Sequence, residues 1–344
     1  MRSIISLIQG MNLQCIHKVR NLFHNRAVIL LYHRVAELCP DIQLLCVSPS
    51  NFESHLQEIT EHYQPISLHN LKEYIETNTL PRNAVVITFD DGYVDNLCYA
   101  APLLEKYGVP ATVFVTSGFV DKSNEMVSDA LERVLLSSEK LPEILTLESE
   151  GKTHHWILGE NFQQHKGWNI TSKNDPYPRY RCYRDLHQLM RPMSVSHRQE
   201  VLKQLYDWAG CVGEGCPDRR IMNSDELRRI SHSGLIEIGA HSISHTMLAK
   251  QPLEVQQQEI LDSKKELETI LGSPVTSFAY PYGGRDAVDT HTIELVRNAG
   301  FDVACDNVPG TVGPTTGLYT LPRFLVRDWN RDVFQKQIKN IFLD

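Results

Sequence analysis

Two adjacent carboxylates follow directly after a short, fully apolar segment of the sequence. Asp90, Asp91 and Gly92 come immediately after Ala84–Phe89 (AVVITF), which reads as a buried strand. Paired carboxylates at a buried strand end are costly unless a cation neutralises them. A divalent cation bound to one would lower the pKa of the other and leave it ionised as a base. An ordinary Asp-Asp-Gly turn is the plain alternative for this motif.

Two histidines follow a second apolar segment in the same way. His241 and His245 (HSISH) come after Ile236–Ala240. Their spacing predicts one helical turn with both rings on the same face, about 2.0–2.1 Å from a shared ion. An exposed helix pair is the plain alternative. Combined with Asp91, they form the common three-ligand set of zinc, which nickel, cobalt or manganese could also occupy.

A third motif, Phe278–Gly284 (FAYPYGG), also follows an apolar segment. Its proline and paired glycines predict a rigid loop whose backbone N–H groups could face a developing oxyanion. A simple proline-containing turn is the plain alternative.

Alternating strands and helices must position these three motifs. The apolar segments are typical of parallel strands covered on both faces, and their alternation with helices predicts a parallel sheet with helices outside, open or closed as a barrel. Functional groups gather at the carboxyl ends of such strands. The predicted strands are Ala27–Tyr32, Ala84–Phe89, Ala111–Thr116, Ile236–Ala240, Val275–Tyr280 and Phe301–Cys305, and the predicted helices are Ala100–Tyr107, one capped at Ser224, Leu253–Leu271 and Thr290–Asn298.

The pattern changes between about 120 and 221, where aromatic, His and Arg residues dominate. Helical periodicity is visible only at Val127–Leu136 and Leu186–Trp208. We interpret this stretch as an inserted, mainly helical subdomain with a loop in its middle. The domain prediction is therefore an N-terminal helical segment at 1–26 and one domain at 27–344 that carries the insertion.

Composition narrows the class of protein. The chain has 344 residues, 42% hydrophobic and 22% charged, which suits one large α/β domain or two small ones. A net charge of −8 without a basic stripe argues against nucleic-acid binding. The eight cysteines are spread without CxxC spacing, which favours reduced thiols, although their even number leaves disulfides open.

The N-terminal segment carries no clear targeting signal. It lacks an unbroken apolar region with a cleavage site, so we expect no signal peptide, and no stretch approaches a transmembrane span. Ile4–Phe23 predicts either a helix packed on the domain or a basic amphipathic helix in peripheral contact with a membrane. The expected location is cytoplasmic, with association at the inner membrane face as the variant.

The TFDDG, HSISH and PYG blocks resemble, in this order, those of the NodB-type polysaccharide deacetylases, carbohydrate esterase family four. The resemblance spans about 28 to 334, interrupted by the insertion. It implies a distorted, incomplete (β/α) barrel and metal-dependent hydrolytic N-deacetylation of an N-acetylated sugar, in a cell-surface polysaccharide or its precursor, with release of acetate. It assigns Asp90 as general base, Asp91, His241 and His245 as metal ligands, and the Tyr282 N–H to the oxyanion hole.

Two positions depart from the family pattern. Many members carry an Arg in the third block that orients the base, where this chain has Ala279; the nearby Arg285 is a candidate substitute. The C-terminal block, which usually supplies a His as general acid, has none at Leu321–Phe324. His33, after the first strand, resembles the histidine of the permuted poly-N-acetylglucosamine deacetylase branch and is the predicted acid, with a histidine bonded within the barrel rim as alternative.

The remaining predictions concern the substrate. We expect Tyr280, Pro281, Arg285 and Arg323 to contact it, with Asp328 beside Arg323 in the pocket. The insertion should cover the site, and its aromatic side chains would either stack on sugar rings or pack the subdomain. Two rival functions stay open: a related amidase acting on a small or cyclic amide, and a carbohydrate-binding pseudoenzyme, suggested by the missing Arg and His.

Overall fold

The computed structural model describes residues 25–343 except 38–39, 160–161, 166, 212 and 214. The amphipathic-helix prediction for Ile4–Phe23 therefore lies outside the described residues. Within them, no helix combines the length and apolarity needed to cross a membrane.

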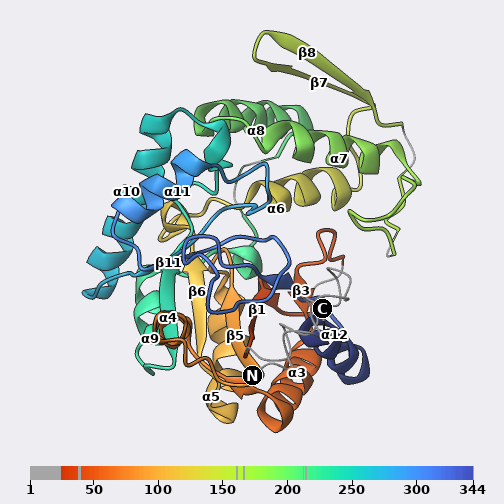
Figure 1. Cartoon of the computed structure of the whole chain (residues 1–344). Helices are drawn as coiled ribbons and strands as arrows, with labels where there is room; N and C mark the ends of the chain where they lie inside the picture. Colours follow the sequence, from red (N-terminus) through yellow and green to blue (C-terminus); the bar gives the residue numbers. More distant parts are fainter. Residues whose placement is uncertain are drawn as a thin grey trace, which may run out of the picture.

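The described part of the chain is built around a curled parallel sheet, seen in Figure 1. Its strands lie in the order β11-β10-β9-β6-β5-β1-β12, with β4 also paired to β5. An isolated parallel bridge from Cys305 to Leu321 links β11 to the segment before β12, so the ring is nearly completed. The predicted distorted, incomplete (β/α) barrel is confirmed. The strands are β1 (Ala27–Tyr32), β4 (Gln64–Pro65), β5 (Ala84–Phe89), β6 (Ala111–Val115), β9 (Ile236–Ala240), β10 (Ser277–Ala279), β11 (Val303–Cys305) and β12 (Phe324–Leu325).

Helices cover the outside of this sheet, as the alternating pattern predicts. The helix after Asn223 begins with a capping box between Asn223 and Glu226, so the cap predicted at Ser224 lies one residue earlier. The predicted helix at Ala100–Tyr107 is preceded by a π-helical turn, Asn96–Ala100. The covering helices are α3 (Pro49–His62), α4 (Leu68–Thr77), α5 (Ala101–Tyr107), α9 (Ser224–Ser231), α10 (Leu253–Leu271), α11 (Thr290–Asn298) and α12 (Arg331–Leu343).

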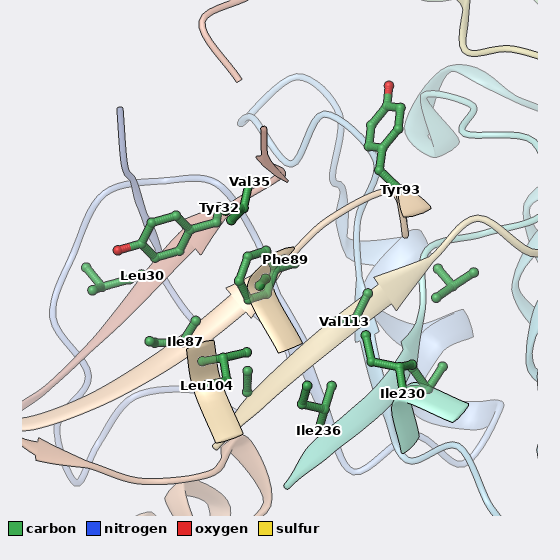
Figure 2. Close-up of a cluster of buried hydrophobic side chains, with 14 of the residues drawn as sticks. Leu30, Tyr32, Val35, Ile87, Phe89, Tyr93, Leu104, Val113, Ile230 and Ile236 are labelled. Carbon is green, nitrogen blue, oxygen red and sulfur yellow. The ribbon is translucent and has the colours of Figure 1, made fainter. Parts of the chain in front are cut away.

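Buried side chains fill both faces of the strands. All six residues of β1 and of β5 are buried, which explains their unbroken apolar sequence. Figure 2 shows the cluster between sheet and helices, in which Leu104 of α5 and Ile230 of α9 meet residues from the strands. The opposite faces of the strands pack into a second cluster that includes Ile29 and Val86.

The insertion has a hydrophobic core of its own and lies over the barrel, with its helices drawn above the strands in Figure 1. It contains α6 (Val127–Leu131), a π-helical turn (Glu132–Leu136), α7 (Pro178–Met190) and α8 (Val195–Ala209). The single helical stretch predicted at Leu186–Trp208 is in fact two helices that separate at Arg191-Pro192, because proline has no N–H to continue the helical hydrogen bonds and its ring clashes with the preceding turn. The predicted central loop contains an antiparallel hairpin, β7 (Ile144–Ser149) and β8 (Lys152–Ile157), which projects beyond α8.

The thiols are free where they are described. These are Cys46, Cys98, Cys182, Cys211, Cys216 and Cys305.

Candidate active site

The two carboxylates lie where β5 ends, at the carboxyl edge of the sheet. The Asp90 N–H donates to the Tyr32 carbonyl at 3.0 Å, which continues the β1–β5 ladder by one residue. Asp91 and Gly92 then turn sharply with φ of 72° and 86°. A positive φ is strained for Asp and is typical of functional sites, whereas Gly92 adopts it freely. Both carboxylates are buried, with 1% and 3% of their surfaces exposed.

The histidine motif is a loop and not the predicted helical turn. Ser242 and His245 both have positive φ, 59° and 52°, which no helix contains. The loop nevertheless brings the rings together: Asp91 Oδ1 lies 3.6 Å from His241 Nε2 and 3.4 Å from His245 Nε2. The expected convergence of these three residues is therefore present, by a backbone path that the spacing did not reveal.

These three side chains fit a divalent cation. One atom from each lies within 4.8 Å of the other two. Donors at 2.0–2.2 Å from a tetrahedral ion stand roughly 3.4 Å apart, close to the separations found here. Within the described residues, the buried Asp91 Oδ1 has no hydrogen-bond partner, and burial and then the Asp90 charge raise the pKa of Asp91. A cation would satisfy this oxygen and remove both penalties.

The histidines are prepared as neutral donors. Burial lowers the pKa of both His241 and His245, so their imidazoles are uncharged near pH 7. The Nδ1 of His241 lies 2.7 Å from the Ala279 carbonyl oxygen, to which it must donate. This bond leaves Nε2 of His241 as the lone-pair nitrogen facing Asp91, the usual arrangement of a metal-binding histidine.

Arg323 holds Asp90 in a bidentate ion pair. Its Nη1 and Nη2 each lie 2.7 Å from one oxygen of the carboxylate. Burial alone would raise the pKa of Asp90, but the charges of Arg323, His241 and His33 together with the hydrogen bonds from Arg323 outweigh burial, and the pKa falls to about 2. Asp90 is therefore an ionised acceptor at neutral pH, in the state that a general base requires.

The structure contradicts the substrate-binding prediction for Arg323. All five of its N–H donors are used within the protein, by Asp90 (twice), Thr88 Oγ1, Asn307 Oδ1 and the Asp306 carbonyl. Arg285, proposed to orient Asp90, is exposed instead. Arg323 contacts Asp90 instead; it lies directly before β12, which pairs with β1 although it is far along the sequence.

His33 follows β1 and lies beside this ion pair. Burial lowers its pKa to about 4, against the opposing charge of Asp90. No described residue bonds its buried Nδ1, so the alternative of a histidine bonded into the barrel rim finds no support at this atom. Burial keeps this imidazole neutral near Asp90 at pH 7.

The third motif packs against the histidine loop. Tyr282 has φ of 64°, and its ring packs 4.8 Å from that of His245. Its carbonyl accepts from Asn307 Nδ2 at 3.1 Å, so Asn307 links this loop to Arg323. Asn307 was not singled out in the sequence, and no motif there marks it.

Three further residues that were predicted to contact the substrate or line its pocket are held within the fold. Tyr280 is fully buried and donates to the Tyr319 carbonyl, so it is a core residue; Pro281 is buried beside it. Asp328 accepts from Ser48 N–H and Asn51 Nδ2 at the start of α3, and that it also lines the pocket stays a prediction. Tyr280 and Asp328 are thus bonded to neighbours that sequence spacing does not show.

Most insertion aromatics pack the subdomain. Trp168, Tyr180 and Tyr183 are buried in its core, which favours the packing alternative over sugar stacking for these three. The insertion also borders the site: a pocket of about 600 Å³ lies between α8 and the segment after β6, and Ser244 and His245 form part of its wall.

Comparison with known proteins agrees with this geometry. The family described as polysaccharide deacetylase matches residues 77–137 and 208–304, on either side of most of the insertion. The poly-beta-1,6-N-acetyl-D-glucosamine N-deacetylase of Staphylococcus aureus strain MRSA252 is 32% identical over 330 residues, covering 92% of this chain and 82% of that protein. The same-named protein of strain MSSA476 is 23% identical over the same coverage.

The fold is shared with a solved structure. IcaB from Ammonifex degensii superposes with a TM-score of 0.56 at 17% identity, over 92% of this chain and 96% of that one. Matching motifs, a relative above 30% identity over most of its length and a common barrel lead to one assignment. The chain belongs to the polysaccharide deacetylase family.

Proposed function

We propose that this protein is a zinc-dependent deacetylase that hydrolyses the acetamide of N-acetylglucosamine-type residues in a polysaccharide or its precursor. The proposal is carried by one juxtaposition: a metal-fitting trio, Asp91, His241 and His245, beside a carboxylate that Arg323 keeps ionised. A divalent ion bound there would supply Lewis acidity, polarising the acetamide carbonyl and acidifying the attacking water.

The protein's own residues would handle the protons and the charge. Asp90 takes a proton from the water while the water oxygen attacks the acetyl carbon. The backbone N–H of Tyr282 donates to the developing oxyanion. The C–N bond then breaks, and His33 delivers a proton to the leaving nitrogen, giving acetate and a free amine. Because the pKa of His33 is about 4, that proton must reach the imidazole during turnover.

The test is a metal analysis paired with an acetate-release assay. The first substrate is β-1,6-linked N-acetylglucosamine oligomers, because relatives are named for that polymer. We expect acetate release that stops on chelation and returns with zinc. Glycan binding without acetate, at full zinc occupancy, would favour the pseudoenzyme; hydrolysis of small cyclic amides alone would favour the amidase.

One of the two observations that suggested a pseudoenzyme no longer applies. It rested on a missing base-orienting Arg and a missing C-terminal His, and Arg323 now contacts both oxygens of Asp90.

A further inference from the structure

The loop that carries the second histidine lies between two buried charges of opposite sign. Glu259 extends from α10 on the barrel, and Arg198 extends from α8 in the insertion. Only 6% and 4% of their surfaces are exposed. Within the part of the chain that the structure describes, neither has an ion-pair partner within 4.0 Å, although a buried charge normally needs one.

Glu259 accepts hydrogen bonds from donors of the loop. The backbone N–H groups of Ile243 and Ser244 donate to Glu259 Oε2 at 3.0 and 2.9 Å. The Ser244 hydroxyl donates to Oε1 at 2.7 Å. Bonds from a carboxylate to backbone N–H groups are charge-assisted and stronger than neutral ones.

Arg198 donates hydrogen bonds to acceptors of the same loop. Its Nη2 donates to the Ser244 carbonyl at 3.0 Å and its Nη1 donates to the His245 carbonyl at 3.1 Å. Two successive peptide groups of the loop therefore point their N–H bonds toward the anion, and the next two point their carbonyls toward the cation. This polarity solvates both buried charges and fixes the loop in one orientation.

The held conformation is one the chain would otherwise avoid. Ser242 and His245 both lie in the left-handed region, which is unfavourable for residues with a Cβ. Without the contacts to Arg198 and Glu259, the loop has a local reason to relax, and relaxation would move His245, whose Nε2 lies 3.4 Å from Asp91 Oδ1.

We propose that Arg198, with Glu259 opposite it, is a positioning residue for the metal site, so that the insertion completes this site from outside the barrel. This inference rests on the proposed function only in taking Asp91, His241 and His245 as the metal ligands. Arg198 is not one of the three grouped ligands, and it acts through the carbonyls of the loop.

The test is metal binding by Arg198→Met, which keeps the apolar length of the side chain and removes its donors. We expect zinc affinity, measured by competition with a chelating dye, to fall about 10–100-fold, as is usual when a partner of a metal ligand is lost. The cobalt-loaded variant should show altered d–d absorption, because the position of one nitrogen donor has changed. Arg198→Lys should recover part of the affinity, since one carbonyl can still be bound.

A matched control is available within the insertion. Arg179 is equally buried, at 1% exposure, and its Nη1 donates to the Ser138 carbonyl, but it has no contact with the histidine loop. Arg179→Met should therefore lower the melting temperature while leaving zinc affinity and the cobalt spectrum unchanged. This comparison separates a general loss of stability from loss of loop positioning.

The outcomes are distinct. Wild-type zinc affinity and cobalt spectrum in Arg198→Met would overturn the inference; if that variant does not fold, the same readouts on Glu259→Gln decide it. Metal binding is measured without substrate, so a wild type that binds zinc but releases no acetate would refute the proposed function and leave this inference intact.

Discussion

At the scale of single residues, the site depends on giving two adjacent carboxyls opposite properties. Asp90 and Asp91 are neighbours in sequence and both are buried, yet the pKa of Asp90 is lowered and that of Asp91 is raised. Burial and then the Asp90 charge raise the pKa of Asp91, whereas Arg323, which contacts both oxygens of Asp90, helps to lower the pKa of Asp90 against its own burial. Among the described residues, none donates a hydrogen bond to Asp91 Oδ1. One carboxylate is thus prepared to accept a proton and the other to accept a cation.

Replacing the base should separate catalysis from metal binding. Asp90→Asn keeps the shape of the side chain but cannot accept the proton, so acetate release should fall at least about 100-fold. Zinc content should stay near that of the wild type, because Asp90 is not one of the three grouped ligands. The exposed Asp286→Asn, on the neighbouring rim loop, serves as control and should retain activity. Near-normal turnover in Asp90→Asn would remove Asp90 from the mechanism.

Removing Arg323 should produce a pH-dependent defect. Arg323→Met leaves burial to dominate at Asp90, so its pKa rises from about 2 and less carboxylate is ionised as the pH falls. The ratio of variant to wild-type kcat/KM should therefore decrease from pH 8 to pH 5. Arg82→Met, exposed before β5 at the opposite end of the barrel, should show a flat ratio.

The same substitution should also weaken the fold. It leaves a buried carboxylate without its partner, at a cost of about 3–5 kcal/mol in the free energy of unfolding. Circular dichroism before the pH series establishes that the variant is folded. A ratio of kcat/KM that does not change with pH in the folded variant would contradict control of the base by Arg323.

At the scale of elements, the histidine loop depends on close packing against the segment after β6. The N–H of Gly118 donates to the Ile243 carbonyl at 2.9 Å, and the N–H of Ser117 donates to the Ser242 carbonyl at 3.1 Å. A Cβ at Gly118 would stand only 2.5 Å from the Ile243 carbonyl oxygen. Glycine is therefore required at this position by contact between two loops.

Gly118→Ala should displace the histidine loop. We expect a loss of about 1–3 kcal/mol in the free energy of unfolding, the usual cost of forced backbone shifts, together with weaker zinc binding. Gly313→Ala is the matched control, because no atom lies within 4 Å of its added Cβ, and it should change stability by less than about 0.5 kcal/mol. Urea titration and dye competition measure the two effects. Equal behaviour of the two variants would argue against this packing constraint.

At the scale of the whole molecule, barrel and insertion have separate hydrophobic cores joined by buried polar contacts. Arg34 Nη2 donates to the Asp218 carbonyl at 2.7 Å, and the Tyr93 hydroxyl donates to Asp129 Oδ2 at 2.8 Å. Arg198 adds the contact to the histidine loop. These links place the metal site at the junction, so its occupancy should affect the stability of the whole chain.

Zinc should raise the melting temperature of the wild type. Binding only to the folded state stabilises it by about 2.7 kcal/mol when free zinc is one hundred times its Kd. Chelation should reverse the shift, and Asp91→Asn should abolish it, because the carboxylate ligand is lost. Differential scanning fluorimetry with and without zinc measures this. An equal shift in Asp91→Asn would mean that zinc binds elsewhere.

Much of the fold and the central trio could be predicted from the sequence. Apolar runs such as Ala27–Tyr32 and Ala84–Phe89 are buried on both faces, so their boundaries were predictable. The residues that end these strands must meet at one edge of a parallel sheet, which brought Asp91, His241 and His245 together before any coordinates. Such inferences succeed because they depend on local pattern and on topology alone.

The sequence by itself therefore determined the parallel sheet, the edge that carries the site and the residues that meet there, and the family resemblance added the barrel. Only the tertiary structure decided which groups orient them: Arg323 in place of Arg285, Asn307 beside it, and Arg198 with Glu259 around the histidine loop. These partners lie far apart along the chain, at positions that share no period or motif. Their contacts arise from packing between elements, which spacing along one strand or helix does not encode.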